Sequence, residues 1–241
     1  MELKLALLIS GGGTTAEAII KASQDGVLSG VQPVCVISSS NTAAGIDRAQ
    51  NAGVPLKAIV VLEPKKFESP LAFGEAILKA CQERSVNFIG QYGWHWLTPE
   101  NVISEFEGRI VNQHPGPLDN GRPDFGGPGM FGLRVHAARL CFVRKVNRDF
   151  FTEATTHRVT PEFDKGAIVK RKVLAILAED TPESLQKRLL PIEWQTQIEA
   201  LQDFANDTGQ EWYRLAPLVR PDEEKILADC KQEAMRLYPE G

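Results

Sequence analysis

Short apolar runs alternate with segments of helical periodicity through the first 112 residues of the chain. The apolar runs predict strands, and the segments between them predict helices. The strands are expected at residues 3–9, 31–37, 56–62, 86–92 and 108–112, and the helices at 14–24, 42–52, 69–84 and 98–105. This alternation is typical of an α/β fold, in which a mostly parallel, twisted, Rossmann-like sheet has helices on both faces. Ligands of such sheets bind outside the carboxyl ends of the strands, so we look for functional residues there.

The pattern changes in the second half of the chain, at the stretch "DNGRPDFGGPGMFG" of residues 119–132. Its five glycines and two prolines predict a long loop, which is typical of a lid, a binding loop or a disordered insertion. Beyond it we expect a helical segment from 133, strands at 152–160 and 167–175, a helix at 182–205 that Pro191 kinks or splits, and a last helix at 221–237. We therefore expect one domain over residues 1–205, with 119–132 inserted as a loop, and a C-terminal helical extension over 206–241.

Composition and charge narrow the class of protein. The 241 residues are 43% hydrophobic and carry a formal net charge of −4, which gives no general attraction to nucleic acid or to an acidic membrane. No apolar run approaches the roughly 20 residues of a membrane span, and the N-terminus lacks a signal-peptide pattern, so we expect a cytoplasmic protein. The four cysteines lie far apart with no C-x-x-C. We expect neither a zinc site nor a disulfide framework, and we expect most of the four cysteines to be buried free thiols.

A glycine-rich turn, "ISGGGTTAEAII" at residues 9–20, joins the first strand to the first helix. The unpaired N–H groups and the dipole at the start of a helix attract an anion. Gly11, Gly13 and Ala16 also fit the dinucleotide pattern G-x-G-x-x-G/A. The acid that should follow about 20 residues later is missing, which disfavours NAD and leaves NADP open. The hydroxyls of Thr14 and Thr15 suit a single phosphate better, and a tight turn without a ligand is the structural alternative.

The stretch "IVNQHPGP" places Asn112 and His114 two residues apart at the end of a strand. In extended backbone both side chains point to the same face of the sheet. A carboxamide N–H and a protonated imidazole are the donors that a developing oxyanion needs. An Asn–His pair that only satisfies a turn is the alternative.

A second histidine, His157, lies in the stretch "THRVTPEFDKGAIV", in a strand that is followed by a turn with Asp164. Such a turn can be a simple hairpin connection. If the carboxylate met His114 in space, it would raise the pKa of the imidazole and orient it for acid–base chemistry.

These three stretches resemble the motifs of the formyltransferases that use 10-formyltetrahydrofolate, the family that includes phosphoribosylglycinamide (GAR) formyltransferase. The family's phosphate turn matches "LLISGGGTTAEAII", its Asn-x-His-Pro matches Asn112 to Pro115, and its His-x-Val-Thr-x-x-x-Asp-x-Gly matches His157 to Gly166. The motifs occur in the family's order, with near-family spacing, over about residues 3–200. The resemblance implies a Rossmann-like formyltransferase domain and transfer of a formyl group from the folate N10 to the amine of a phosphorylated substrate, with glycinamide ribonucleotide of purine biosynthesis as first choice.

The resemblance also implies roles for individual residues. Asn112 and His114 would stabilise the oxyanion of a tetrahedral intermediate, while Asp164 would keep His114 charged and help to move the amine proton. Neither a metal ion nor a covalent enzyme intermediate is expected. The remaining assignments are Gly13, Thr14, Thr15, Pro115 and Glu193 for the substrate, with its phosphate on the turn and its ribose at Glu193, and Trp94, His95, Trp96, Leu97, Val159 and Phe163 for the folate. Packing of the "QYGWHWL" aromatics into the core is the alternative for each tryptophan.

The chain departs from the family pattern on the side of the amine substrate. The family usually continues Asn-x-His-Pro with Ser-Leu-Leu-Pro and a short loop, whereas this chain has the longer "GPLDNGRPDFGGPGMFG". Leu190, followed by Pro191, stands where a Lys or Gln is often found. The stretch 134–148 holds five Lys and Arg residues and no acid. It could attract a phosphate-rich substrate or the folate glutamate, but a solvated helix face is the more usual meaning.

Several other functions remain open at this point. A formyltransferase for another phosphorylated amine, such as an amino-sugar nucleotide, would share the chemistry. Formyltetrahydrofolate deformylase and methionyl-tRNA formyltransferase are disfavoured, because no extra N-terminal domain and no basic C-terminal domain is evident. The alternatives of another class are an NADP-binding oxidoreductase and a non-catalytic nucleotide-binding module. The sequence is silent on the oligomeric state.

Overall fold

The structure is a computed structural model that describes residues 2–241. Its seven strands are ordered β3-β2-β1-β4-β5-β6-β7. The chain forms two compact units. The first runs to Gln113 and adds Arg158–Pro161 and Gln197–Gly209, and the second comprises His114–His157, Glu162–Thr196 and Gln210–Gly241.

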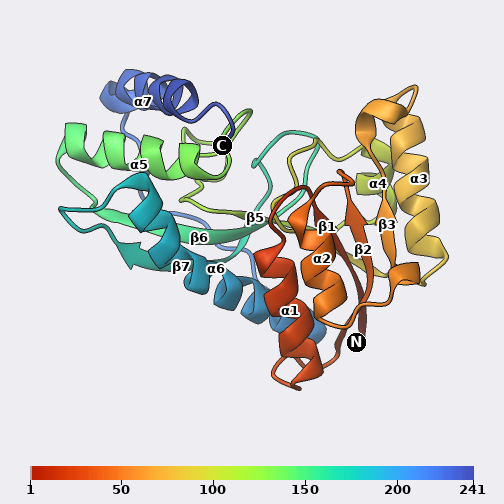
Figure 1. Ribbon diagram of the computed structural model, residues 1–241. Coiled ribbons are helices and arrows are strands. Elements are labelled where there is room, and N and C mark those ends of the chain that lie inside the picture. Colours follow the sequence, from red (N-terminus) through yellow and green to blue (C-terminus); the bar gives the residue numbers. More distant parts are fainter. Residues whose placement is uncertain (1) are drawn as a thin grey trace. The chain divides into compact units, whose positions relative to one another are not determined.

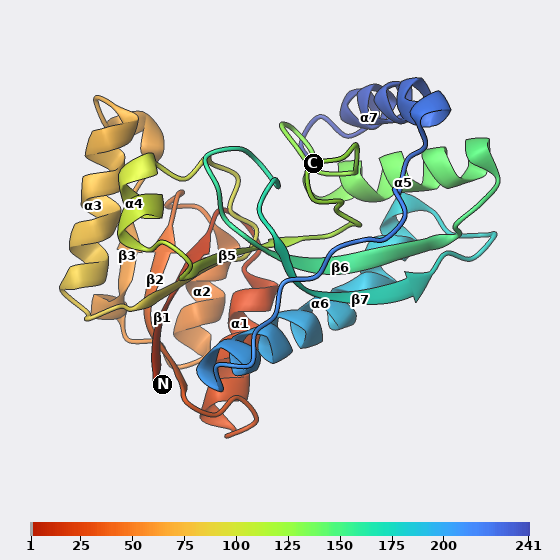
Figure 2. The ribbon, with the colours of Figure 1, turned by 180° about the vertical axis from the view of Figure 1, so that it is seen from behind.

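The first unit is a parallel sheet with helices on both faces, which confirms the fold class expected from the sequence (Figures 1 and 2). Strand β1 pairs in parallel with both β2 and β4, and β2 pairs likewise with β3 and β4 with β5. Helices α1 and α2 cover one face, and α3 and α4 cover the other. The elements are β1 (Leu3–Ile9), α1 (Thr14–Gln24), β2 (Val31–Ser38), α2 (Ala44–Asn51), β3 (Ile59–Val61), α3 (Pro70–Gln82), β4 (Phe88–Gln91), α4 (Glu100–Glu105) and β5 (Ile110–His114).

One strand of this unit is shorter than its apolar run suggests. The run at 56–62 yields only three strand residues in β3, because Leu56–Ala58 form a 3-10 turn. Pro55 precedes this turn, and its carbonyl accepts a hydrogen bond from the Ala58 N–H at 2.8 Å. Proline cannot donate to a sheet ladder, so pairing begins only after the turn.

The second unit contains helices α5 (Leu133–Val146) and α7 (Glu224–Leu237), the antiparallel strands β6 (Phe151–Arg158) and β7 (Ile168–Ala175), and most of α6 (Pro182–Ala205). Pro191 was expected to kink or split this helix. Helix α6 runs through Pro191 as one element, so the split is wrong, while the kink stays a prediction. A proline in a helix removes one backbone hydrogen bond. Leu185 and Leu189, which precede it on the helix, are both fully buried, and such burial stabilises a helix.

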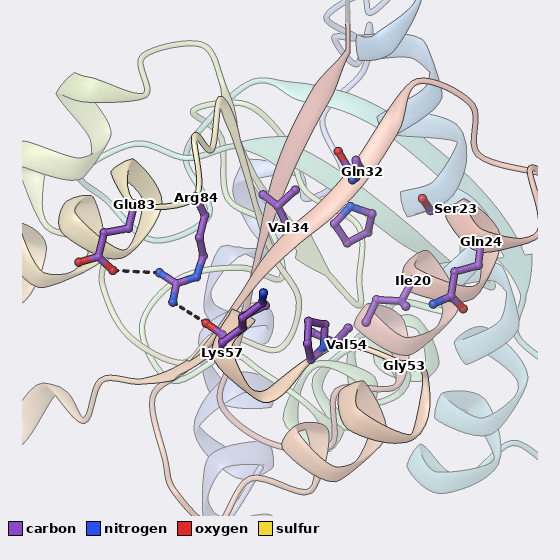
Figure 3. Close-up of a pocket in the computed structure, with 13 residues that line it drawn as sticks. Ile20, Ser23, Gln24, Gln32, Val34, Gly53, Val54, Lys57, Glu83 and Arg84 are labelled. Atoms are coloured by element: carbon purple, nitrogen blue, oxygen red, sulfur yellow. Dashed lines mark hydrogen bonds and ion pairs between the residues drawn. The ribbon is translucent and has the colours of Figure 1, made fainter.

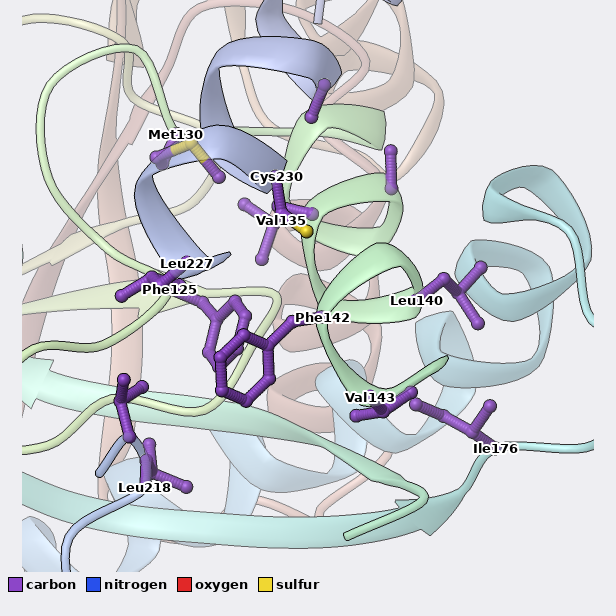
Figure 4. Packing of buried hydrophobic residues seen from close by; sticks show 14 of the residues in the cluster. Phe125, Met130, Val135, Leu140, Phe142, Val143, Ile176, Leu218, Leu227 and Cys230 are labelled. Atoms are coloured by element: carbon purple, nitrogen blue, oxygen red, sulfur yellow. The ribbon is translucent and has the colours of Figure 1, made fainter. Parts of the chain in front are cut away.

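The core of this unit lies under α5 and α7 (Figure 4). Helix α5 lies between α7 and the β6–β7 hairpin (Figure 1). The rings of Phe125 and Phe142 meet edge to face with centroids 5.4 Å apart, and Leu227 of α7 packs into the same cluster. The segment after residue 205 therefore contributes to the core, while the boundary that the sequence suggests there stays a prediction.

A disulfide joins the two helices, between Cys141 of α5 and Cys230 of α7, with their Cα atoms 5.7 Å apart. The expectation that this chain has no disulfide framework is wrong at this pair. The two cysteines are 89 residues apart in sequence, so no local spacing signals the pairing. Cys35 and Cys81 are buried free thiols, as expected, and burial raises the pKa of Cys35 to about 11 and that of Cys81 to about 12. Within residues 2–241 there is no helix with the length and apolarity to cross a bilayer.

Removal of the disulfide should destabilise the protein. Closing an 89-residue loop in the unfolded chain is worth roughly 2–5 kcal/mol, so the Cys141→Ser/Cys230→Ser double variant should unfold at a lower temperature than the wild type. Dithiothreitol should lower the Tm of the wild type and leave that of the double variant unchanged. A titration that finds four free thiols in the denatured, unreduced wild type would contradict the disulfide itself.

Candidate active site

The glycine turn between β1 and α1 is shaped by a close backbone approach. Gly13 caps α1 with φ of 67°, and a Cβ built there would lie 2.5 Å from the Cα of Gly45. The N–H of Gly45 donates to the carbonyl of Gly11 at 3.0 Å. Gly13 and Gly45 are therefore required by packing alone, whereas a Cβ at Gly11 would meet nothing within 4 Å. No side chain caps the first turn of α1, so the amides beside Thr14 and Thr15 keep the arrangement that suits an anion.

The hydroxyl groups after β2 bond to one another and to the glycine turn. Ser39 Oγ donates to Ser10 Oγ at 2.8 Å, and Ser38 Oγ donates to the carbonyl of Ser40 at 2.7 Å. Ser10 Oγ also accepts the backbone N–H of His95 at 3.1 Å. These side chains stabilise the end of the strand and supply no carboxylate for a ribose, which favours an anion site over a dinucleotide site.

The second unit brings His114, Asp164 and His157 together. His114 is the last residue of β5, and its Nδ1 lies 3.6 Å from Asp164 Oδ2. His157, near the end of β6, has its Nε2 3.3 Å from the other oxygen, Oδ1. The N–H of Gly127 donates to Asp164 Oδ2 at 2.9 Å. The condition that the sequence left open, a carboxylate that meets His114 in space, is thus fulfilled.

Burial controls the charge of this cluster. It lowers the pKa of His114 below its ordinary value, and this effect exceeds the opposite effect of Asp164. His157 and Lys231 lower the pKa further, whereas Asp124 raises it. Burial alone would raise the pKa of Asp164, but the two imidazoles and the Gly127 N–H hold it well below its usual value. The directions of both shifts favour an ionised Asp164, and burial favours the neutral form of His114. The role of Asp164 in keeping His114 charged stays a prediction.

The environment of the second imidazole nitrogen is set by Gly116. His114 Nε2 is buried and, within the part of the chain that the structure describes, has no hydrogen-bond partner. A Cβ at Gly116 would lie 3.4 Å from this nitrogen and would collide with Val135. Thr155 Oγ1 donates to the carbonyl of Gly116 at 2.8 Å and fixes the turn. A larger residue at 116 would therefore crowd the nitrogen that faces away from Asp164.

The loop 119–132 also contacts the carboxylate of Asp164. Asp124 is buried, and its two oxygens accept the N–H groups of Asp119 and Gly126 at 3.0 and 2.9 Å. A Cβ at Gly126 would lie 2.6 Å from the Cβ of Asp164, so only glycine permits this approach. The Gly-Gly pair was visible in the sequence as a loop signal, but its contact with Asp164 was not. Asp124, Gly126 and Gly127 are therefore site residues that sequence reasoning missed.

The aromatic segment after β4 lines a pocket of about 620 Å³ in the first unit. Trp96 and Leu97 contribute to its wall, together with Phe67 and Pro161. Trp94 does not: it is 7% exposed and stacks on Phe73 with centroids 6.2 Å apart. Trp94 therefore packs in the core, which is the alternative that the sequence left open for each tryptophan.

The other expected binding residues are placed as follows. The His95 side chain is exposed, and Val159 packs against the same hydrophobic cluster as Trp96. Asn112 is half-buried in β5, opposite Gln91 in the register of β4. Pro115 and Phe163 are half-buried in the second unit, and Glu193 is buried on α6.

A second pocket of the first unit, of about 710 Å³, lies at the amino ends of the strands (Figure 3). It is lined by the start of β2 and by Lys57, which precedes β3. The guanidinium of Arg84 donates to the carbonyls of Lys57 and Ala80 at 2.7 and 3.0 Å, and Gln24 donates to that of Ala52 at 2.7 Å. The polar groups that line this pocket already bond to the surrounding backbone. Ligands of parallel sheets also bind at the opposite edge, outside the carboxyl ends of the strands. We therefore assign no chemistry to this pocket.

The basic stretch 134–148 is only in part a solvated helix face, since Arg144 and Lys145 are exposed whereas Arg139 is not. Arg139 is completely buried and donates to the carbonyls of Phe151 and Asp149, both at 2.8 Å. Arg134 and Arg144 likewise bond to carbonyls of the C-terminal segment and of the turn before α6. The neighbouring His136 is also buried, which lowers its pKa to about 3. These side chains hold the unit together. Within residues 2–241 no group of three or more His, Cys, Asp and Glu side chains has the arrangement of a metal site.

Comparisons with known proteins agree with this arrangement. The family model described as formyl transferase matches residues 3–201. The chain is 34% identical to the chloroplastic phosphoribosylglycinamide formyltransferase of Vigna unguiculata, over 85% of this chain and 61% of that protein. It is 31% identical to the phosphoribosylglycinamide formyltransferase of Haemophilus influenzae, over 80% of this chain and 82% of that protein. The chain thus spans about three fifths of the length of the plant relative.

A solved structure shows the same fold. The glycinamide ribonucleotide transformylase 1 of Symbiobacterium toebii superposes with a TM-score of 0.74 at 29% identity, over 85% of this chain and 88% of that one. Together with the family model, which covers most of the chain, these likenesses show that the protein belongs to the formyl transferase family.

Proposed function

We propose that this protein transfers a formyl group from 10-formyltetrahydrofolate to the amine of glycinamide ribonucleotide, a step of purine biosynthesis. The observation that carries the proposal is the buried pair of His114 and Asp164, 3.6 Å apart, in a chain of this family. The relative in Haemophilus influenzae bears the name of this activity.

The chemistry follows from the state of the pair. The substrate amine attacks the formyl carbon, and the carbonyl π electrons move to oxygen and form an oxyanion. His114, neutral before the reaction, accepts the amine proton at Nε2 and becomes an imidazolium that the Asp164 carboxylate stabilises. Asn112, two residues away on β5, donates its amide N–H to the oxyanion. The bond from carbon to N10 then breaks, and N10 takes the proton. This sequence of steps requires no metal ion.

The pocket at Trp96 and Leu97 fits the folate. Its volume of about 620 Å³ lies in the usual range for small-molecule sites, and aromatic walls suit a flat ring. Lys65 and Glu68 at its rim are exposed, and Lys65 can attract the carboxylates of the folate tail. His95 and Val159 are the further folate contacts proposed in the first unit, and the assignment of Phe163 to the folate stays a prediction.

The glycine turn fits the phosphate of the amine substrate. Its donors would be the backbone N–H groups of Gly13, Thr14 and Thr15, with the dipole of α1 behind them. Pro115 would border the substrate, and Glu193 would bind its ribose hydroxyls. A different phosphorylated amine, such as an amino-sugar nucleotide, is the second candidate, since the loop 119–132 is longer than the family's and Leu190 replaces its usual polar residue.

We place this activity in the cytoplasm. Two of the plant relatives are named as chloroplast proteins, so the compartment differs within the family. The Cys141–Cys230 disulfide is unusual for a reducing compartment. A count of free thiols in protein taken from cells under alkylating conditions would show which redox state the compartment maintains.

The deciding experiment measures tetrahydrofolate release from 10-formyltetrahydrofolate, with and without glycinamide ribonucleotide. Release that requires this amine supports the proposal. Release without any amine would identify a deformylase, and folate binding without release would direct the search to other phosphorylated amines. Binding of a nicotinamide nucleotide with no folate binding would favour the oxidoreductase.

His114→Ala and Asn112→Ala should each lower kcat by about 100-fold or more, because the first removes the group that accepts the amine proton and the second removes a donor to the oxyanion. The measurement is the steady-state rate with saturating folate and amine. Arg158→Ala is a matched control, since Arg158 ends β6 and donates to the carbonyl of Gly108; it should retain most of the rate. Unchanged rates in both site variants would exclude this mechanism.

The rate should depend on pH through His114. Because the neutral imidazole accepts the proton, kcat should be level near pH 7 and fall at lower pH, as His114 becomes protonated below its ordinary pKa. Asp164 raises that pKa. Asp164→Asn should therefore reduce kcat and also move the fall to still lower pH. A pH profile that does not move in this variant would show that the two groups are not coupled.

Gly13→Val should weaken the substrate phosphate site. The new side chain would collide with Gly45 and shift the amides at the start of α1. We expect a higher KM for the phosphorylated amine, with a smaller change in the KM for folate. An equal effect on an amine that lacks the phosphate would contradict the assignment.

A further inference from the structure

Helix α7 lies beyond residue 201, where the match to the family ends, but it reaches the acid–base cluster. The disulfide at Cys230 and the buried Leu227 and Ala234 hold it against α5 (Figures 1 and 4). The residue after Cys230 is Lys231, and this half-buried side chain points to the loop 119–132 rather than to solvent. Its burial is costly for an ammonium group unless oxygen atoms surround it.

Lys231 and Asp164 form hydrogen bonds to opposite ends of one peptide group. Lys231 Nζ donates to the carbonyl of Gly126 at 2.7 Å. The N–H of Gly127, which belongs to the same peptide, donates to Asp164 Oδ2 at 2.9 Å. A cation on the carbonyl polarises the peptide and makes its N–H a stronger donor. The oxygen that receives this N–H is also the one that lies 3.6 Å from His114 Nδ1.

The loop is built so that this peptide can lie there. Gly127 has φ of 103°, a conformation that side chains rarely permit. Gly126 has no room for a Cβ beside Asp164. The neighbouring Asp124 accepts the Gly126 N–H and supplies a negative charge near Lys231. Burial of the lysine lowers its pKa, and the nearby Lys165 lowers it too, while the carboxylates of Asp124 and Asp164 raise it and so offset part of this cost. The carbonyl of Gly126 accepts a hydrogen bond from its ammonium group.

We propose that Lys231 is a positioning residue for the reaction: through the Gly126–Gly127 peptide it orients the Asp164 carboxylate toward His114. This inference rests on the proposed function, because it concerns the same acid–base pair. It assigns a role in catalysis to the C-terminal helix, which the family match does not include.

The test compares Lys231→Met, which keeps most of the aliphatic stem, with Lys225→Met, an exposed lysine of the same helix. Lys231→Met should lower kcat about tenfold, with little change in the KM of either substrate, since positioning affects the transition state rather than binding. Lys225→Met should retain full activity. Lys231→Arg keeps the charge and the donor and should recover part of the rate. Circular dichroism and the Tm check that each variant is folded.

A double-mutant cycle identifies the route of the effect. If Lys231 acts through Asp164, adding Lys231→Met to Asp164→Asn should lower kcat by less than twofold further. A full additional tenfold loss would show that Lys231 acts elsewhere and would overturn the proposal. Equal losses in Lys231→Met and Lys225→Met would overturn it too, since they would reflect a general weakening of α7.

Hydrogen exchange at the Gly127 amide tests the contact without any activity measurement. Exchange at this amide should be about tenfold faster in Lys231→Met than in wild type or Lys225→Met, because its donor bond to Asp164 weakens. Unchanged exchange together with unchanged kcat would refute the positioning role. If Asp164→Asn itself keeps full activity, the proposed function has failed; unchanged Gly127 exchange in Lys231→Met would instead show failure of this inference alone.

Discussion

The buried carboxylate of Asp164 is the constraint on which the second unit depends. An ionised group away from water is costly unless donors replace the lost hydration. Asp164 receives one from the loop, at Gly127, and lies beside His157 of β6 and His114 of β5. These three neighbours come from separate segments of the chain, so the carboxylate can remain ionised only when all three segments are folded. The same requirement fixes the orientation of His114, the residue to which we assign the chemistry.

The sequence predicted most of the framework because its signals are local. The apolar runs located β1 and β2 within a residue of their ends. The alternation of strands and helices predicted that the strands of the first unit pair in parallel. The resemblance to the family also implied that His114 and Asp164 belong together, and the structure brings His114 Nδ1 within 3.6 Å of Asp164 Oδ2. The error at β3 has a local cause as well, since Pro55 starts a 3-10 turn where the apolar run suggested a strand.

The parts that the sequence did not predict depend on contacts between distant residues. The pairing of Cys141 with Cys230 joins two helices that are 89 residues apart. The lowered pKa of His114 is another such feature, because the sequence shows the carboxylate of Asp164 but not the burial whose opposite effect on this pKa is larger. Arg139 was expected on a solvated face for a similar reason. The spacing of basic residues in the sequence does not show whether a guanidinium bonds to water or, as here, to the carbonyls of Phe151 and Asp149.

Residues beyond position 201, where the family match ends, supply partners to buried carboxylates of the segments that precede this position. Glu153 of β6 is fully buried, and its partners are Arg171 of β7 and Arg214 of the C-terminal segment. Asp119, also fully buried, accepts the N–H of Leu218 at 2.9 Å. A buried carboxylate that loses its donors destabilises a protein far more than a missing surface contact does. The unusually long loop and the C-terminal segment are therefore mutually dependent: the loop contributes a buried carboxylate and the Gly126 carbonyl, and the segment contributes the donors that make their burial stable.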